Sequence, residues 1–250
     1  MMLDHDIREA FAAPAPNAAR HEFHVHRNVE VWTWSVAVAI AAELRRDLHA
    51  RPRSRLLLSG GKTPGSVYKA LAMAPLEWER IDVGLVDERW LMPDDPDSNA
   101  WLVRQTLLRE HAAQARFEAL TLPGRSIEEA VAVANAHAQQ PACIAVLGMG
   151  NDGHVGSLFP GMTDLDRALQ SRHAYVAVDT YGVASADPWH RRISLTPTGL
   201  GRAQTRILLI RGADKRLAFE RAVHSANPYH WPILAARNAG DSPLQVHWCA

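Results

Sequence analysis

The sequence predicts an α/β protein built as one doubly wound domain, in which helices cover both faces of a mostly parallel sheet. Short, continuous apolar runs alternate with helix-like segments along most of the 250 residues. Such runs are typical of strands buried on both faces, and strand–helix alternation favours parallel pairing. Glycine-rich or charged turns follow several of the runs, which is where open α/β sheets bind their ligands.

The predicted elements follow one another along the chain. Residues 1–20, rich in Ala and Pro, predict a loose arm, and residues 21–250 form the expected single domain. The alternating segment 21–26 (HEFHVH) predicts a strand, and the segment 29–50 predicts a long helix. Further strands are expected at residues 55–60, 81–88, 142–149, 174–179, 192–196 and 205–212. Further helices are expected from Pro64, from Ser98, over residues 126–140 and from Ala213.

Composition and charge narrow the classes of partner. The 27 basic and 27 acidic residues give a formal net charge of zero. Binding to nucleic acid or membrane usually needs a basic surplus, so we expect neither, and an anionic small molecule would be captured by local charge. Two cysteines outside any CxxC pattern, the lack of a long apolar run and the lack of a signal-peptide pattern predict a cytoplasmic protein with free thiols.

Metal binding is conceivable at His24 and His26, which share one face of the first predicted strand. No third ligand is evident nearby, so a surface strand with solvated imidazoles is favoured. The 13 histidines also show no HExxH spacing. We therefore expect no metal site.

The segment 148–160 (GMGNDGHVGSLFP) places an acid and an imidazole on a flexible turn after a predicted buried strand. Glycines permit a positive φ and a close approach of the backbone to a ligand. Histidine changes charge near neutral pH and can move protons. Asp152 and His154 are therefore candidate catalytic residues, and Gly150 is a candidate ligand-binding position.

The segment 56–71 (LLLSGGKTPGSVYKAL) predicts a strand, a glycine turn and a helix. Thr63 is expected to cap this helix, with Pro64 at its first position. The pattern is neither GxxxxGK[ST] nor GxGxxG, and a plain strand-to-helix turn stays open. An anion could meet the free N–H groups of the turn, which belong to Ser59, Gly60, Gly61, Lys62 and Thr63.

Charged and polar residues also follow the predicted strand 81–88. The triplet in GLVDERW consists of Asp87, Glu88 and Arg89, at the carboxyl end of an apolar run, although such triplets are also common in solvated loops. In the PDDPDSN segment that follows, Ser98 or Asp97 is expected to cap a helix. Asn99 would add a polar contact there.

Two more segments contribute cations. The segment 191–197 (RRISLTP) would place Arg192, Ser194 and Thr196 on one strand face. Lys215 falls in the first turn of a predicted helix, where a cation opposes the helix dipole unless it holds an anion. The strand ends together bring glycine N–H groups, cations, acids and one histidine to one edge of the sheet. That set predicts a site for a small phosphorylated polyol, with acid–base chemistry at its centre.

These segments, in this order and spacing, resemble the 6-phosphogluconolactonase family, which shares a superfamily with glucosamine-6-phosphate deaminases and isomerases. The resemblance covers roughly residues 25–225 and rests on SGGKTP, VDERW, DSN, GMGNDGHVGSLFPG, RISLT and GADK. It implies a three-layer α/β sandwich with a Rossmann-like sheet. It also implies hydrolysis of 6-phosphoglucono-1,5-lactone to 6-phosphogluconate in the oxidative pentose phosphate pathway, without a metal or organic cofactor.

The resemblance also implies roles for matching residues. His154 would be the general base that draws a proton from water as it attacks lactone C1, and Asp152 would orient the histidine or the sugar. Asp87 joins this catalytic set. The SGGKTP loop, with Arg192 and Lys215, would hold the phosphate.

Some further residues match the family pattern, and others depart from it. Arg89 would lie close to the phosphate or to the developing oxyanion, and Asn99 and Gly150 would complete the binding set. Lys62 and Gly156 stand where the family often has a small polar residue and an alanine. The segment from Asn227 to the C-terminus matches the family only loosely, so its role is open.

Two alternatives stay open: an amino-sugar-phosphate deaminase or isomerase on the same fold, and a non-catalytic sugar-phosphate sensor. The deaminases carry a Glu just before the proline of this motif, whereas Phe159 precedes Pro160 here. A phenyl ring cannot transfer a proton, which favours the lactonase. A sensor would carry a DNA-binding module, and no helix-turn-helix with a basic face is evident in the first 50 residues. We expect a monomer or a weak homodimer.

Overall fold

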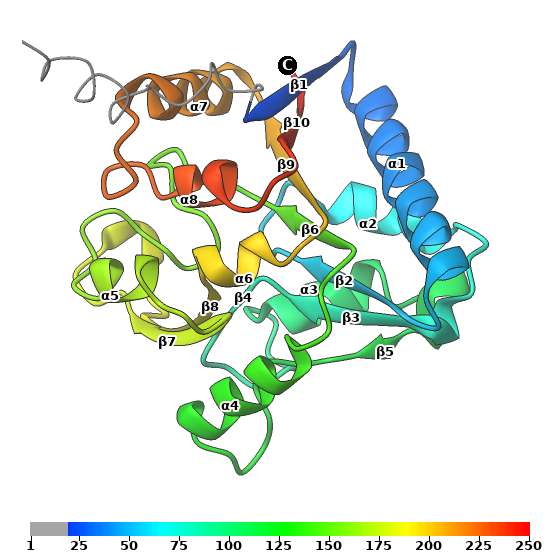
Figure 1. The fold of residues 1–250 in the computed structure, drawn as a ribbon, viewed down its shortest axis with the longest axis horizontal. Coiled ribbons are helices and arrows are strands. Elements are labelled where there is room, and N and C mark those ends of the chain that lie inside the picture. Colours follow the sequence, from blue (N-terminus) through cyan, green and yellow to red (C-terminus); the bar gives the residue numbers. More distant parts are fainter. Residues whose placement is uncertain (1–19) are drawn as a thin grey trace, which may run out of the picture.

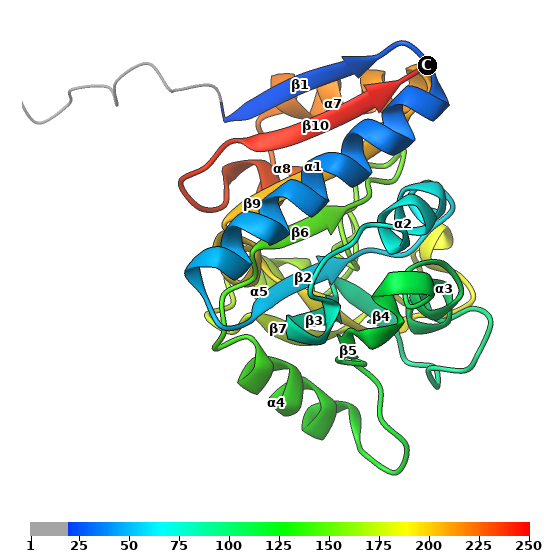
Figure 2. The ribbon, with the colours of Figure 1, turned by 90° about the vertical axis from the view of Figure 1, so that its right-hand side faces the viewer.

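The computed structural model describes residues 20–250, so the predicted arm lies outside the described residues except for Arg20. A seven-stranded sheet runs through the described chain with helices on both sides, which makes three layers (Figures 1 and 2). The strand order is β1-β10-β9-β6-β2-β3-β5, and every neighbouring pair is parallel. The strands are β1 (His21–His26), β2 (Ser54–Leu58), β3 (Ile81–Leu85), β5 (Arg116–Phe117), β6 (Ile144–Leu147), β9 (Thr205–Arg211) and β10 (Leu244–Cys249). The predicted fold class is confirmed.

The helices flank this sheet, with α1 and α2 on one side and α7 and α8 on the other (Figure 1). The longer helices are α1 (Val29–Ala50), α2 (Gly65–Ala72), α3 (Asn99–Thr106), α4 (Ile127–His137) and α7 (Ala213–Ser225). The shorter ones are α5 (Leu165–Leu169), α6 (Pro197–Gly201) and α8 (Ile233–Asn238). Single 3-10 turns occupy Trp78–Arg80, Glu110–Gln114 and Ala184–Ala186.

Several helix starts follow from local capping chemistry. The hydroxyl of Ser98 accepts a hydrogen bond from the N–H of Trp101, so Ser98, not Asp97, caps α3. Ser126 begins α4 with a reciprocal capping box. The predicted cap of α2 is wrong, because the helix begins at Gly65 after Pro64 and no side chain caps it. Thr63 therefore stays in the preceding turn.

A second, antiparallel sheet corrects the expectation of one sheet. It has the order β4-β8-β7 and consists of β4 (Asp87–Arg89), β8 (Arg191–Leu195) and β7 (Tyr175–Asp179). The run predicted as one strand over 81–88 is divided between the two sheets. Val86 makes the change, since its N–H donates to the Leu58 carbonyl of β2 while its carbonyl accepts from Leu195 of β8. A continuous apolar run signals burial but does not select the pairing partner.

The C-terminal segment, left open by the sequence, completes the main sheet. Its last strand, β10, lies between β1 and β9 in parallel register with both (Figure 2). The preceding helix α8 is anchored to the glycine-rich turn, because the N–H of Ile233 donates to the Gly153 carbonyl. No helix within residues 20–250 combines the length and apolar character needed to cross a membrane.

The histidines of β1 are partly exposed on an edge strand, and they also pack against β10. His24 lies opposite His247 of β10, and their rings stack with centroids 4.5 Å apart. Nε2 of His26 lies 3.1 Å from Nδ1 of His247, which is buried. Among the described residues, no three metal-binding side chains are arranged to hold an ion. The three imidazoles instead pack across the β1–β10 pair.

We predict that His247 makes the fold sensitive to acid. Burial, followed by the neighbouring His24 and His26, lowers the pKa of His247 to about 3, so the folded protein keeps this ring neutral. A histidine in the unfolded chain gains a proton below about pH 6.5, so stability is lost as the pH falls from there towards 3. When the pH is lowered from 7 to 5, the free energy of unfolding in urea should fall in both proteins. The fall should be about 2 kcal/mol smaller for His247→Gln than for the parent.

The matched control is His111→Gln, which removes an exposed histidine and should follow the parent at both pH values. Equal losses in the parent and in His247→Gln would contradict this explanation.

Candidate active site

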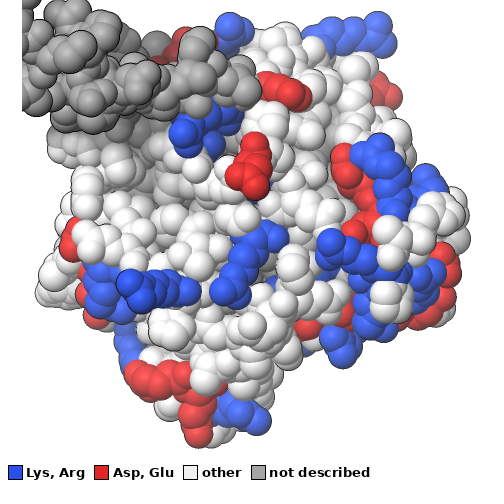
Figure 3. Space-filling model, viewed as in Figure 1, with Lys and Arg blue, Asp and Glu red and all other residues white. Residues whose placement is uncertain are grey.

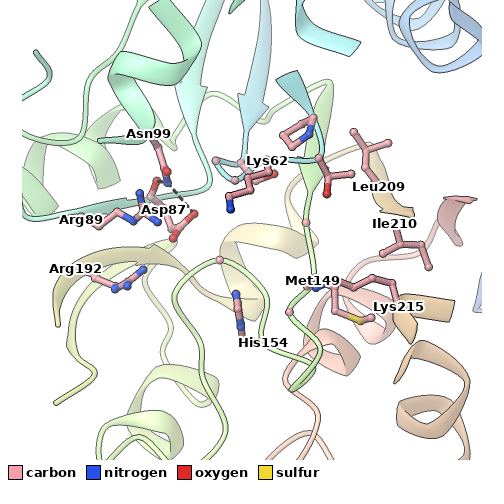
Figure 4. A pocket seen from close by; sticks show the side chains of 18 residues that line it. Lys62, Asp87, Arg89, Asn99, Met149, His154, Arg192, Leu209, Ile210 and Lys215 are labelled. Carbon is pink, nitrogen blue, oxygen red and sulfur yellow. Dashed lines mark hydrogen bonds between the residues drawn. The ribbon is translucent and has the colours of Figure 1, made fainter. Parts of the chain in front are cut away.

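A cavity of about 420 Å³ opens where the glycine-rich turns after β2 and β6 meet the β4–β8 pair (Figure 4). Asp87 and His154 line it, and Asp152 lies behind His154. Every residue predicted to bind substrate lines it as well: Ser59, Gly60, Gly61, Lys62, Thr63, Arg89, Asn99, Gly150, Arg192 and Lys215. The volume falls in the range usual for small-molecule sites. Segments far apart in the sequence thus converge on one cavity, as predicted.

Charge is mixed on the face of the molecule shown in Figure 3, where Lys and Arg side chains are interspersed with Asp and Glu side chains without an extended area of one sign. This agrees with the formal net charge of zero. Capture of an anion therefore depends on the cations inside the cavity.

The turn after β6 holds an imidazole–carboxylate pair. Nδ1 of His154 lies 2.7 Å from Oδ1 of Asp152, which also accepts a hydrogen bond from the backbone N–H of His154. Gly150 permits this close packing, since a Cβ there would lie 2.2 Å from both side chains. Within residues 20–250, no group hydrogen-bonds to Nε2 of His154, so this nitrogen is available to a ligand.

Hydrogen bonding keeps Asp152 ionised. Its side chain is partly buried, which by itself disfavours the charge. Hydrogen bonds from His154 and from the hydroxyl of Ser185, together with the charge of His154, outweigh this effect and hold the pKa of Asp152 well below its usual range. An ionised Asp152 favours the imidazole tautomer with its proton on Nδ1.

An aromatic ring packs against the imidazole of His154. Phe159 is buried, and its ring centroid lies 4.1 Å from that of His154. The guanidinium carbon of Arg192 lies 5.1 Å from the centroid of the same phenyl ring. Phe159 thus packs against two cavity residues without offering either of them a group that transfers protons.

The turn after β2 presents unpartnered hydrogen-bond donors. Within residues 20–250, the backbone N–H groups of residues 60–63 have no acceptor, and neither does the buried hydroxyl of Ser59. Gly60 packs so tightly against Asn99 that a Cβ would lie 1.8 Å from its amide oxygen, and Gly61 has a φ of +94°. Helix α2 begins just after the turn. This arrangement suits an anion.

Polar residues fix the carboxylate of Asp87. Its Oδ2 accepts a 2.6 Å hydrogen bond from the hydroxyl of Ser157. The backbone N–H of Ser157 in turn donates to Oγ of Ser194. The amide of Asn99 donates to the backbone carbonyl of Asp87. Sequence reasoning missed Ser157, because a serine three residues before a proline has no distinctive signal of its own.

Glu88 turns away from the cavity and binds the start of α3. Its fully buried carboxylate accepts hydrogen bonds from the backbone N–H groups of Arg89, Asn99 and Ala100. Burial raises the pKa of Glu88 to about 7, and these hydrogen bonds oppose that rise. The residue links β4 to α3 and so fixes two cavity residues, Arg89 and Asn99. The DER triplet marks Glu88 as a charged residue, but the sequence gives no signal of the three backbone N–H groups that bind its carboxylate.

Three of the four cations that line the cavity form two groups, and the fourth, Lys62, belongs to the turn after β2. Arg89 and Arg192 lie near Asp87, whereas Lys215 lies on the other side of His154 (Figure 4). Arg192 is 5% exposed and donates to the carbonyls of Ala186 and Trp189, and burial lowers its pKa. These fixed positions allow the cavity to meet negative charge at both ends.

Lys215 closes the second end of the cavity. Its ammonium donates to the carbonyl of Met149, and burial lowers its pKa. The apolar side chains of Leu209 and Ile210 line the wall beside it, which the sequence analysis did not predict. They belong to the end of β9, whose apolar run was interpreted only as core.

Comparisons with known proteins identify the family of this chain. The family model described as glucosamine-6-phosphate isomerases/6-phosphogluconolactonase matches residues 28–248. A protein named 6-phosphogluconolactonase from Xylella fastidiosa (strain 9a5c) is 46% identical over 94% of this chain and 99% of its own length. One of the same name from Pseudomonas aeruginosa is 38% identical, over 85% of this chain and 88% of its own.

Solved structures give the same result. The crystal structure of a 6-phosphogluconolactonase from Shewanella baltica superposes with a TM-score of 0.85 at 30% identity, covering 92% of this chain and 98% of that one. A monomeric glucosamine-6-phosphate deaminase has the same fold, with a TM-score of 0.74 at 19% identity over 91% of this chain and 97% of its own. The chain therefore belongs to the family of glucosamine-6-phosphate isomerases and 6-phosphogluconolactonases.

Proposed function

We propose that this chain hydrolyses 6-phospho-D-glucono-1,5-lactone to 6-phospho-D-gluconate. The observation that carries the proposal is the His154–Asp152 pair, whose imidazole lines a cavity with cations at both ends. Relatives at 46% and 38% identity carry the name of that lactonase, which supports the same reaction here. The enzyme would act as a hydrolase of a cyclic carboxylic ester.

His154 would act as the general base and then as the general acid. As water attacks C1 of the lactone, Nε2 takes one proton from that water. Asp152 holds the Nδ1–H and stabilises the imidazolium that forms. The bond from C1 to the ring oxygen then breaks, and the imidazolium returns its proton to that oxygen. One water is consumed, and the acid product ionises in solution.

The two groups of cations would bind the two ends of the substrate. The donors of the turn at residues 60–63, with Ser59 and Lys215, would hold the phosphate. Arg89 and Arg192, on the other side of His154, would face the lactone end and stabilise negative charge at its carbonyl oxygen. The resemblance implies a different assignment, in which Arg192 joins Lys215 at the phosphate, and the variants described below distinguish the two. Asp87 would accept a hydrogen bond from a sugar hydroxyl.

Phe159 argues against isomerisation. That reaction requires proton transfer among C1, C2 and the ring oxygen, for which the deaminases use a further Glu before the proline. Here the buried Phe159 packs on His154 and provides no such group. Hydrolysis of a lactone proceeds without it, because the ring opens by attack of water on an ester carbonyl.

We predict that His154→Ala lowers kcat by about 10²–10⁴-fold with little change in KM, because the imidazole acts mainly in the transition state. The lactone is generated in place with glucose-6-phosphate dehydrogenase, and its disappearance is followed with and without the protein. His190 pairs with Asp179 at 3.0 Å on an exposed segment, so His190→Ala is a matched control that should keep full activity. Retention of more than half of kcat in His154→Ala would exclude it as the base.

We predict that Lys215→Ala weakens binding of 6-phosphogluconate by about 2–4 kcal/mol, the range for losing one partner of a desolvated charge pair. Turnover of unphosphorylated gluconolactone should hardly change, whereas Arg192→Ala should impair both lactones alike. The control is Arg216→Ala, on the same helix but packed on Phe23 and Trp248. Calorimetry measures the affinity for 6-phosphogluconate. Equal turnover of the phosphorylated and the unphosphorylated lactone by the parent would refute a phosphate site.

We predict that the purified protein releases no detectable ammonia from glucosamine 6-phosphate, because Phe159 replaces the acid that ring opening and isomerisation need. An ammonia assay with a glucosamine-6-phosphate deaminase as the positive control measures this directly. Robust release of ammonia would mean that Asp87 and His154 suffice, and it would assign the chain to the deaminase branch.

A further inference from the structure

Both oxygens of the Asp152 carboxylate are hydrogen-bonded, and the two partners come from different parts of the chain. Oδ1 faces Nδ1 of His154, two residues away, at 2.7 Å. Oδ2 accepts a 2.7 Å hydrogen bond from the hydroxyl of Ser185, which lies 33 residues further along. Ser185 belongs to the 3-10 turn Ala184–Ala186, in the connection between β7 and β8.

The bond from Ser185 is not explained by a need to satisfy a buried group. Ser185 is exposed, so water could hydrate its hydroxyl at no cost to the fold. Asp152 lies on a turn next to Gly153, which has a φ of +79°. Without Ser185, only Oδ1 would be held, by Nδ1 and the backbone N–H of His154, and the carboxylate could turn about its Cβ–Cγ bond. The hydroxyl of Ser185 fixes the second oxygen, restrains that rotation and keeps Oδ1 directed at the imidazole.

The turn that carries Ser185 is itself fixed by a cavity residue. The guanidinium of Arg192 donates to the carbonyl of Ala186 at 2.7 Å and to that of Trp189 at 2.7 Å. Trp189 in turn donates to the side chain of Asp97 at 3.2 Å. The connection between β7 and β8 therefore joins the carboxylate behind His154 to the arginine on the other side of the cavity.

We propose that Ser185 is a positioning residue for the His154–Asp152 pair: its hydroxyl sets the orientation of the carboxylate and, through it, the orientation of the imidazole. The proposal deepens the lactonase function proposed above and depends on His154 being the base. Hydrogen-bond partners that orient a metal-bound histidine contribute about tenfold or more to activity, and we expect an effect of that order here. Ser185 touches neither substrate nor water in the reaction, so its effect falls on kcat.

The test compares three variants. In Ser185→Ala, kcat should fall about tenfold while KM stays within about twofold of the parent. The acidic limb of the pH–rate profile should move to lower pH, because a carboxylate that is no longer directed at Nδ1 stabilises the imidazolium less. Ser185→Thr, which keeps the hydroxyl, should restore kcat and the position of the acidic limb. Tyr181→Ala, an exposed change in the same connection, should behave as the parent does.

A second measurement needs no substrate. In the proton NMR spectrum of the free protein, the Nδ1–H signal of His154 is expected to be protected in the parent and in Ser185→Thr, and lost by exchange in Ser185→Ala. An unchanged signal, or a Ser185→Ala enzyme with more than half of the parental kcat and an unmoved acidic limb, would overturn the positioning role. A parent protein with the protected signal but no lactonase activity would instead refute the proposed function.

Discussion

The site depends on a change of sheet at one residue, Val86. Its N–H donates to the Leu58 carbonyl of β2, and its carbonyl accepts from the N–H of Leu195 in β8, both at 2.8 Å. Val86 is buried, so water cannot replace either partner, and both hydrogen bonds must form. The chain consequently leaves the parallel sheet after Leu85 and enters the antiparallel sheet. Asp87 is thereby placed opposite Ser194, beside the turn that follows β2.

Two charged groups of the β4–β8 pair are held by backbone atoms. Glu88 receives three backbone N–H groups, and Arg192 donates to two backbone carbonyls. A charge that is removed from water needs such partners, because leaving it unpaired costs several kcal/mol. The same hydrogen bonds leave these groups little freedom to reorient. A cavity built in this way is organised before a substrate enters, which favours stabilisation of charge that develops during a reaction.

Much of the fold and most of the cavity could be predicted from local patterns. The continuous apolar runs at β2, β6 and β9 indicated buried parallel strands, and Ser98 and Ser126 indicated helix starts. Glycines and charges directly after strands indicated the site, because the carboxyl ends of parallel strands meet at one edge. Residues that act at a distance gave no such signal. Ser157 and Ser185 are ordinary serines until the fold brings one to Asp87 and the other to Asp152.

The sequence by itself determined the class of fold, the positions of the longer helices and most of the residues that line the cavity. Periodicity, caps and glycine turns act over a few neighbouring residues, so short stretches of sequence specify these properties. Only the tertiary structure decided that the strand 81–88 divides between two sheets, that β10 lies between β1 and β9, and that Arg192 and Lys215 occupy opposite sides of His154. Those outcomes depend on which buried backbone groups find partners across long sequence separations, and local periodicity does not specify those partners.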